Sequence, residues 1–110
     1  MGIFLKDINL KGKTALITGA TKGIGRGAAI AIAEAGGNVI AIGRNQTELN
    51  TLKKEIKKFK VKYLPFNCDV NDYNRIKSFI TKLKQLDILV NNAGTNIPEP
   101  FLNVKKSSME

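Results

Sequence analysis

Short, largely apolar runs alternate with longer amphipathic stretches along this chain, and that alternation leaves few folds open. Four such runs occur, at residues 13–18, 38–42, 61–66 and 87–91. Stretches with apolar side chains at helical spacing separate them, at residues 23–35, from residue 45 onward, and at residues 71–86. Strands that are apolar along their length are typical of a parallel sheet covered on both faces, whose crossovers are helices. The sequence therefore predicts an α/β fold in the order βαβαβαβ.

The connections also predict the spatial order of the strands. The order βαβαβαβ matches somewhat more than one mononucleotide-binding unit of a doubly wound fold, in which the second and third strands extend the sheet on one side of the first and the fourth pairs on its other side. We expect a doubly wound parallel sheet with the order 3-2-1-4. Ligands of such sheets bind outside the carboxyl ends of the strands where the winding reverses, which here is between strands one and four.

The last residues predict that this chain is the front part of a larger domain. An irregular segment with Pro98 and Pro100 is followed by Ser107 and Glu110, whose S-x-x-E spacing is typical of a helix start. The fourth strand would also be an open apolar edge, whereas such strands are normally paired on both sides. We interpret residues 1–110 as one incomplete domain, truncated after strand four.

Composition excludes several classes of protein. The chain has one Cys and no His among its 110 residues, so an intramolecular disulfide, the common zinc sites and Ser-His-Asp catalysis are all excluded. We expect no metal. An apolar run of about 18 residues and a signal-peptide pattern are both absent, so we expect a cytoplasmic protein with no membrane partner.

The charge balance is strongly basic, with 18 Lys and Arg against 9 Asp and Glu, a net charge of +9. A nucleic-acid partner is the first hypothesis that such a charge suggests. Much of the excess lies in one segment, at Lys53, Lys54, Lys57, Lys58, Lys60 and Lys62. The one aromatic residue among them, Phe59, shares an apolar helical stripe with Leu49, Leu52 and Ile56. We interpret the lysines as the solvated face of an amphipathic helix and expect no nucleic-acid partner.

A glycine-rich turn joins the first strand to the first helix, with the sequence T-G-A-T-K-G-I-G at residues 18–25. Glycines at such a turn allow a sharp bend, a close approach to a phosphate and tight helix–strand contact. The N–H groups and the positive dipole end of the helix would then hold a pyrophosphate. The candidate cofactor-binding residues of this turn are Gly19, Thr21, Lys22, Gly23, Ile24 and Gly25.

This turn resembles the cofactor loop of the short-chain dehydrogenase/reductase family, whose pattern is T-G-x-x-x-G-x-G. The pair Asp69-Val70 resembles the family's D-V motif, which implies that the Asp69 carboxylate accepts a hydrogen bond from the adenine amino group. The run Asn91-Asn92-Ala93-Gly94 resembles the N-N-A-G motif, which adds Asn92, Ala93 and Gly94 to the candidate cofactor site. The resemblance covers essentially the whole chain, but less than half of a typical member. It implies a Rossmann-like NAD(P)-binding domain from a protein that forms homo-oligomers at full length.

The end of the second strand bears on the choice of cofactor. An acidic residue about 20 positions past the glycines would bind the ribose 2′-OH of NAD. Here Arg44 lies 44 − 25 = 19 positions beyond Gly25, with no acidic neighbour, and a guanidinium suits a 2′-phosphate. Lys22 supplies a second cation, as in members of the family that prefer NADP. We predict that NADP(H) is preferred over NAD(H), with Asn45 as a further binding residue or a helix cap.

The resemblance also implies catalytic residues that have no counterpart here. The family uses a serine and a Tyr-x-x-x-Lys pair, all of which follow the N-N-A-G motif. Tyr73 and Lys77 have the right spacing, but they precede that motif and Tyr73 falls on a predicted apolar helical stripe. We assign no catalytic residue, and we expect the 110-residue chain to be inactive alone.

Two hypotheses about function follow from these observations. The first is the cofactor-binding portion of an NADP(H)-dependent oxidoreductase that interconverts a ketone and a secondary alcohol, such as a 3-oxoacyl thioester or a sugar, as its small-molecule substrate. The alternative is a non-catalytic nucleotide-binding or protein-binding module that exposes the open edge of strand four.

Overall fold

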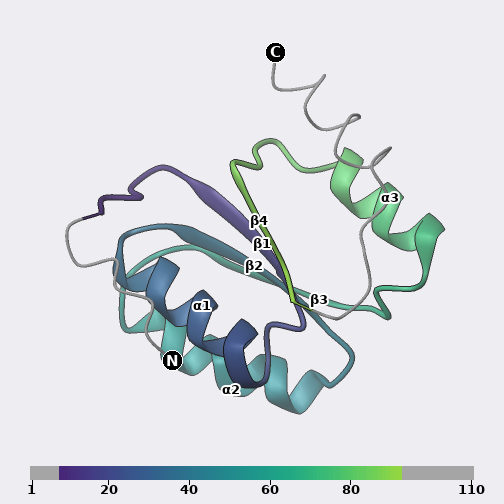
Figure 1. Cartoon of the computed structure of the whole chain (residues 1–110), viewed down its shortest axis with the longest axis horizontal. Helices are drawn as coiled ribbons and strands as arrows, with labels where there is room; N and C mark the ends of the chain where they lie inside the picture. The colour runs from purple at the N-terminus through teal and green to yellow at the C-terminus, as the bar shows by residue number, and fades with distance from the viewer. Residues whose placement is uncertain (1–7, 93–110) are drawn as a thin grey trace.

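A computed structural model describes residues 8–92 of the chain. It contains four strands, β1 (Thr14–Thr18), β2 (Asn38–Gly43), β3 (Tyr63–Asn67) and β4 (Ile88–Asn91). Three helices connect them, α1 (Gly23–Glu34), α2 (Gln46–Lys57) and α3 (Tyr73–Thr81). The strands are all parallel and lie in the order β3-β2-β1-β4, which confirms both the predicted fold class and the predicted order (Figure 1).

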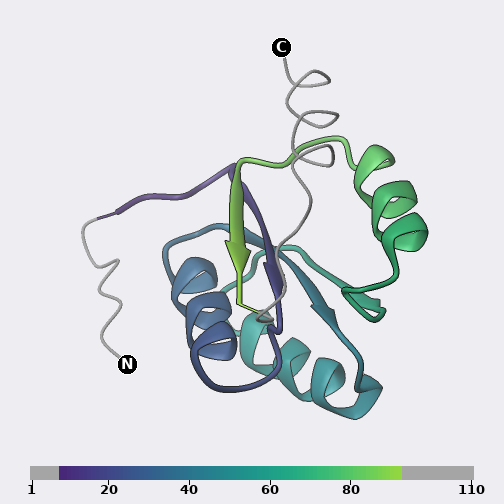
Figure 2. The same cartoon turned by 45° about the vertical axis from the view of Figure 1, so that its right-hand side comes forward.

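The helices cover opposite faces of the sheet, as the right-handed crossovers require. Helices α1 and α2 lie on one face and α3 lies on the other (Figure 2). The two faces have separate apolar clusters: Ile17 and Val39 pack toward α1 and α2, whereas Leu16 and Ile40 pack toward α3. The central strands β1 and β2 are thus buried on both faces. Since β1 pairs with β2 on one side and β4 on the other, the winding reverses between β1 and β4.

Helix α2 is the amphipathic helix that the lysine pattern predicts. Its apolar stripe is buried, with Leu49, Leu52 and Ile56 inaccessible to solvent and Phe59 packed against the same cluster. All six lysines of the segment from 53 to 62 are exposed. Asn45 caps the helix, because its Oδ1 accepts a hydrogen bond of 3.0 Å from the backbone N–H of Glu48.

Several predicted positions differ from the structure. The third strand is Tyr63–Asn67 rather than residues 61–66, and α3 ends at Thr81 rather than continuing to residue 86. The predicted apolar stripe of α3 holds at Ile76 and Ile80, which are buried, but Tyr73 is 41% exposed. On α1, Ile24 is 61% exposed, so it is not part of the buried stripe predicted for that helix. Both exposed residues lie in the first turn of their helix, where the chain enters from the edge of the sheet.

Side-chain contacts fix β4 against β1 at both ends. At the amino end, the backbone N–H of Thr14 donates to the Asp87 carboxylate at 2.9 Å. The Gln85 side chain also donates to that carboxylate, and the two hydrogen bonds hold the pKa of Asp87 below its ordinary value. At the carboxyl end, Thr18 lies opposite Asn91 in register.

No helix within residues 8–92 is long and apolar enough to cross a bilayer.

Candidate cofactor-binding site

The glycine turn after β1 has the geometry that its sequence predicts. Gly19 and Gly23 have φ angles of 59° and 53°, in the left-handed region that favours glycine. A Cβ at Gly25 would collide with the carbonyl oxygen of Gly19 and would lie 2.6 Å from Nδ2 of Asn92. Glycine at position 25 therefore allows α1 to pack directly against the turn.

The start of α1 is available to an anion. Lys22 is its N-cap residue, no side chain caps this end in the described structure, and its first turn contains no acidic residue. The N–H groups of a first helical turn have no partner within the helix, and they lie at the positive end of its dipole. This end can accept a phosphate group.

A hydrogen-bond network joins the glycine turn to the end of β4. The Thr18 hydroxyl donates to Oδ1 of Asn91 at 3.0 Å and accepts from the backbone N–H of Asn92 at 2.9 Å. Nδ2 of Asn92 donates to the carbonyl oxygen of Gly19 at 3.3 Å. Asn92 therefore supports the turn that precedes α1. Thr18, which is inaccessible to solvent, holds the two strand ends together.

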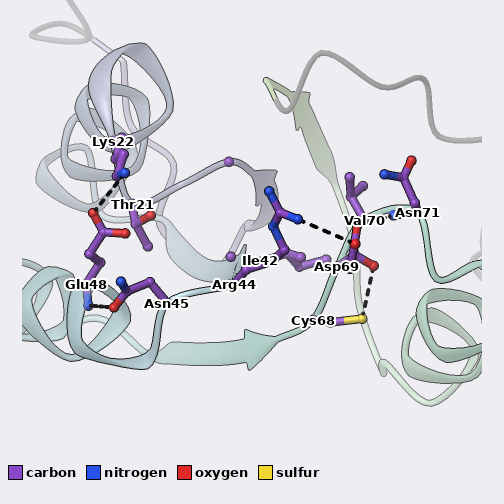
Figure 3. A pocket seen from close by; sticks show the side chains of 12 residues that line it. Thr21, Lys22, Ile42, Arg44, Asn45, Glu48, Cys68, Asp69, Val70 and Asn71 are labelled. Atoms are coloured by element: carbon purple, nitrogen blue, oxygen red, sulfur yellow. Dashed lines mark hydrogen bonds and ion pairs between the residues drawn. The ribbon is translucent and has the colours of Figure 1, made fainter.

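A cleft with a volume of about 480 Å³ opens at the carboxyl edge of β1, β2 and β3 (Figure 3). The residues that line it come from the glycine turn, the end of β2, the start of α2 and the loop after β3. They are Gly19, Thr21, Lys22, Ile42, Gly43, Arg44, Asn45, Glu48, Cys68, Asp69, Val70 and Asn71. The topology alone brings these segments together, since parallel strands end at one edge of the sheet.

Arg44 and Asp69 face each other on this cleft. Nη1 of Arg44 lies 3.6 Å from Oδ2 of Asp69, and the two side chains are 78% and 45% exposed. The other carboxylate oxygen of Asp69 accepts from the backbone N–H of Asn71 at 2.9 Å, which fixes the loop after β3. Asp69 does not cap α3, because that cap is Asp72, which accepts from the N–H of Arg75. The Asp69 carboxylate is therefore held at the cleft by its own loop.

Lys22 forms a second ion pair across the start of α2. Its Nζ lies 3.6 Å from Oε2 of Glu48, and in Figure 3 these two side chains lie on the opposite side of the cleft from Arg44 and Asp69. The sequence pattern from Asn45 to Glu48 resembles a capping box, in which the Glu side chain returns to the backbone of the cap residue. Here the Asn45 side chain caps the helix as in that box. The Glu48 carboxylate, however, pairs with Lys22 instead of the backbone of Asn45.

Cys68 lines the cleft as a buried thiol. It is 3% exposed and belongs to the apolar cluster beneath α3, and its Sγ donates to the Asp69 carbonyl oxygen at 3.3 Å. Burial raises the pKa of the Cys68 thiol, which disfavours the reactive thiolate. Cys68 is therefore a small buried residue of the apolar core.

The predicted site residues fall into three groups. Seven of them share the cleft lining: Gly19, Thr21, Lys22, Arg44, Asn45, Asp69 and Val70. Four others do not line the cleft: Gly23, Ile24 and Gly25 belong to the glycine turn, and Asn92 donates to it. Ala93 and Gly94 lie outside the described residues. Sequence reasoning assigned no role to Thr18, although Thr18 is the first residue of the glycine motif, and it missed the ion pair of Glu48, which no local pattern marks.

Tyr73 and Lys77 do not join this cleft. Tyr73 is the first residue of α3 and Lys77 lies in the middle of that helix, and neither residue lines the cleft. Among residues 8–92, no cluster of His, Cys, Asp or Glu side chains could hold a metal ion.

Comparisons with known proteins agree with this geometry. The family model described as short chain dehydrogenase matches residues 13–110. A 2-dehydro-3-deoxy-D-gluconate 5-dehydrogenase from Pseudoalteromonas atlantica is 37% identical over 101 residues, which is 87% of this chain and 40% of that protein. This chain thus spans about two fifths of the length of that curated relative.

Solved structures show the same similarity. L-sorbose reductase from Gluconobacter frateurii, complexed with NADPH and L-sorbose, has a TM-score of 0.73 and 31% identity, over 83% of this chain and 36% of that one. Carveol dehydrogenase from Mycobacterium avium, in complex with NAD, has a TM-score of 0.70 and 26% identity, over 88% of this chain and 44% of that one.

The parallel sheet in the order 3-2-1-4, with a glycine turn and a cleft at its carboxyl edge, defines a Rossmann-like domain. The family match covers most of the chain and follows the same motifs. The chain belongs to the short-chain dehydrogenase family.

Proposed function

We propose that the cleft binds the adenosine half of NADP(H), and that this chain supplies the cofactor-binding part of an NADP(H)-dependent short-chain oxidoreductase. The observation that carries the proposal is the presence of two cations, Lys22 and Arg44, on one cleft beside a glycine turn. The additional charge of NADP(H) is its 2′-phosphate, and the long side chains of Lys22 and Arg44, which extend from opposite sides of the cleft, are suited to bind it between them.

The chemistry of the cleft residues fits each part of the adenosine half. The first turn of α1 offers N–H groups for the pyrophosphate, and the loop of Asp69 and Val70 borders the adenine, whose amino group would donate to Asp69. Asn45 would border the ribose, and Asn92 would support the glycine turn from the end of β4, while Ala93 and Gly94 belong to the proposed site through the family resemblance alone. When bound, the nicotinamide would supply hydride transfer to or from a substrate carbon.

The Arg44–Asp69 ion pair does not prevent this binding. Both side chains are exposed and 3.6 Å apart, and exposed pairs of this kind contribute about 0–1 kcal/mol. A bidentate contact between a guanidinium and a phosphate is stronger, at about 1.5–3 kcal/mol for hydrogen bonds to charged groups. Arg44 can therefore turn to the 2′-phosphate and leave the Asp69 carboxylate to the adenine.

The proposed substrate is a small ketone or secondary alcohol that carries further hydroxyl groups. Support for this class comes from the similar proteins, one of which is a sugar-acid dehydrogenase and another a sorbose reductase. We further propose that the full-length protein acts as a homo-oligomer, which the family resemblance implies.

Isothermal titration of the chain with NADPH and with NADH tests the proposal. We expect NADPH to bind at least about tenfold more tightly, because the 2′-phosphate adds charge-assisted hydrogen bonds worth about 1.4 kcal/mol or more. Equal affinities, or tighter binding of NADH, would contradict the assignment of NADP(H).

A further inference from the structure

Glu48 lies on the same cleft as the cations proposed to bind the 2′-phosphate, but its carboxylate is negatively charged, as the phosphate is. Its Oε2 is 3.6 Å from Nζ of Lys22, and its side chain is 30% exposed against 78% for Lys22 (Figure 3). Glu48 is thus the more enclosed partner of the pair. Lysine has a long and flexible stem, so Lys22 can move its ammonium group toward a ligand.

The structure fixes the position of Glu48 independently of any ligand. Its backbone N–H donates to Oδ1 of Asn45 at 3.0 Å, which anchors the first turn of α2. The next residue, Leu49, is inaccessible to solvent within the apolar cluster beneath α1 and α2. The backbone of Glu48 therefore stays at the edge of the cleft when Lys22 turns away, and its carboxylate remains within reach of Lys22.

We infer that Glu48 sets how strongly this cleft discriminates between NADP(H) and NAD(H), because its carboxylate competes with the 2′-phosphate for Lys22. The inference rests on the proposed function, since it concerns the same cleft. A ligand with a 2′-phosphate must draw Lys22 away from Glu48 and therefore breaks the Lys22–Glu48 ion pair. A ligand with a 2′-hydroxyl leaves the Lys22–Glu48 pair intact.

The two acidic side chains on the cleft therefore have opposite effects. Once Arg44 leaves Asp69, the Asp69 carboxylate can accept a hydrogen bond from the adenine amino group in place of the ion pair. No replacement partner is proposed for Glu48 once Lys22 leaves it. The Lys22–Glu48 ion pair therefore lowers the affinity for NADP(H) and leaves the affinity for NAD(H) unchanged.

The test uses two probes that differ only in the 2′-phosphate, adenosine 2′,5′-bisphosphate and adenosine 5′-monophosphate, with the Glu48→Gln variant of the full chain. Glutamine keeps the length of the side chain, and the cap on α2 uses the backbone N–H of residue 48, so the helix is retained. We expect the bisphosphate to bind about 3- to 5-fold more tightly, since exposed ion pairs contribute up to about 1 kcal/mol. The affinity for the monophosphate should change by less than about 1.5-fold.

Glu55→Gln is the matched control. Glu55 is also on α2 and pairs with Lys58 at 3.1 Å, but neither residue lines the cleft. This variant removes the same charge and should leave both affinities at their wild-type values. In a Lys22→Met background, Glu48→Gln should change the bisphosphate affinity by less than about twofold, because the contested cation is gone.

The outcomes separate the inference from the proposed function. If wild-type protein prefers the bisphosphate but Glu48→Gln behaves like Glu55→Gln, or binds the bisphosphate more weakly, the inference is overturned and the proposed function stands. A gain that persists in the Lys22→Met background also overturns it. If wild-type protein binds both probes equally, the proposed function itself fails.

Discussion

Replacing Arg44 with aspartate is expected to weaken the binding of NADPH by about 100-fold. The change removes the guanidinium proposed to hold the 2′-phosphate, and hydrogen bonds to a charged group contribute about 1.5–3 kcal/mol. The new carboxylate also repels the phosphate, whereas it can accept a hydrogen bond from the ribose 2′-OH of NADH. The affinity for NADH should therefore stay the same or increase, so that the preference reverses. Isothermal titration of each variant with both cofactors measures this directly.

Lys53→Asp is the matched control for Arg44→Asp. Lys53 is exposed on α2 and does not line the cleft, yet its replacement changes the net charge by the same amount. If the loss of NADPH affinity reflects the net charge of +9 rather than a local contact, both variants will lose it equally. An unchanged preference in Arg44→Asp would refute the role given to this residue.

Replacing Gly25 with alanine is expected to destabilise the fold by about 1–3 kcal/mol and to abolish cofactor binding. The added methyl group would collide with the Gly19 carbonyl oxygen, which is backbone and cannot move without shifting the turn. Overpacking of this kind typically costs about 1–3 kcal/mol. A glycine-to-alanine change within a helix normally stabilises it by about 1 kcal/mol. A decrease in the free energy of unfolding would therefore indicate the collision with the Gly19 carbonyl oxygen. Urea unfolding measures the free energy of unfolding.

Gly43→Ala is the control for stability. A Cβ at Gly43 would lie 3.2 Å from Cγ2 of Thr21, a side-chain methyl that can shift by a few tenths of an ångström. We expect its free energy of unfolding to remain within about 0.5 kcal/mol of wild type, as is usual for substitutions that need little repacking. Equal stability of Gly25→Ala and wild type would show that α1 does not pack against the turn as described.

The sequence predicts the architecture well because the architecture depends on burial patterns. Apolar runs identify β1 and β2, and the alternation of strands and helices matches a doubly wound fold whose strand order is known. The same pattern misleads at α3, where Leu83 and Leu86 continue the predicted helical spacing. Leu86 is buried and Leu83 packs against the same cluster, but the helix has already ended at Thr81. Apolar spacing reports which side chains are buried, and it reports the backbone conformation only indirectly.

The candidate site is predictable where a motif is local and unpredictable where partners are distant in the sequence. The glycine turn and the Asn45 cap each involve neighbouring residues, and both have the expected geometry. The partner of Glu48 is Lys22, 26 residues earlier, and only the pairing of β1 with β2 brings the two together. A local capping pattern therefore predicts the cap and misses the ion pair.

The most direct test of the proposed site is a map of the backbone amide shifts of the 110-residue chain on addition of NADPH, by nuclear magnetic resonance with ¹⁵N labelling. The account predicts that the largest shifts occur in the glycine turn, at Arg44 and at Asp69, with small shifts at the exposed lysines of α2. Shifts concentrated on those lysines, or spread evenly over the surface, would contradict it.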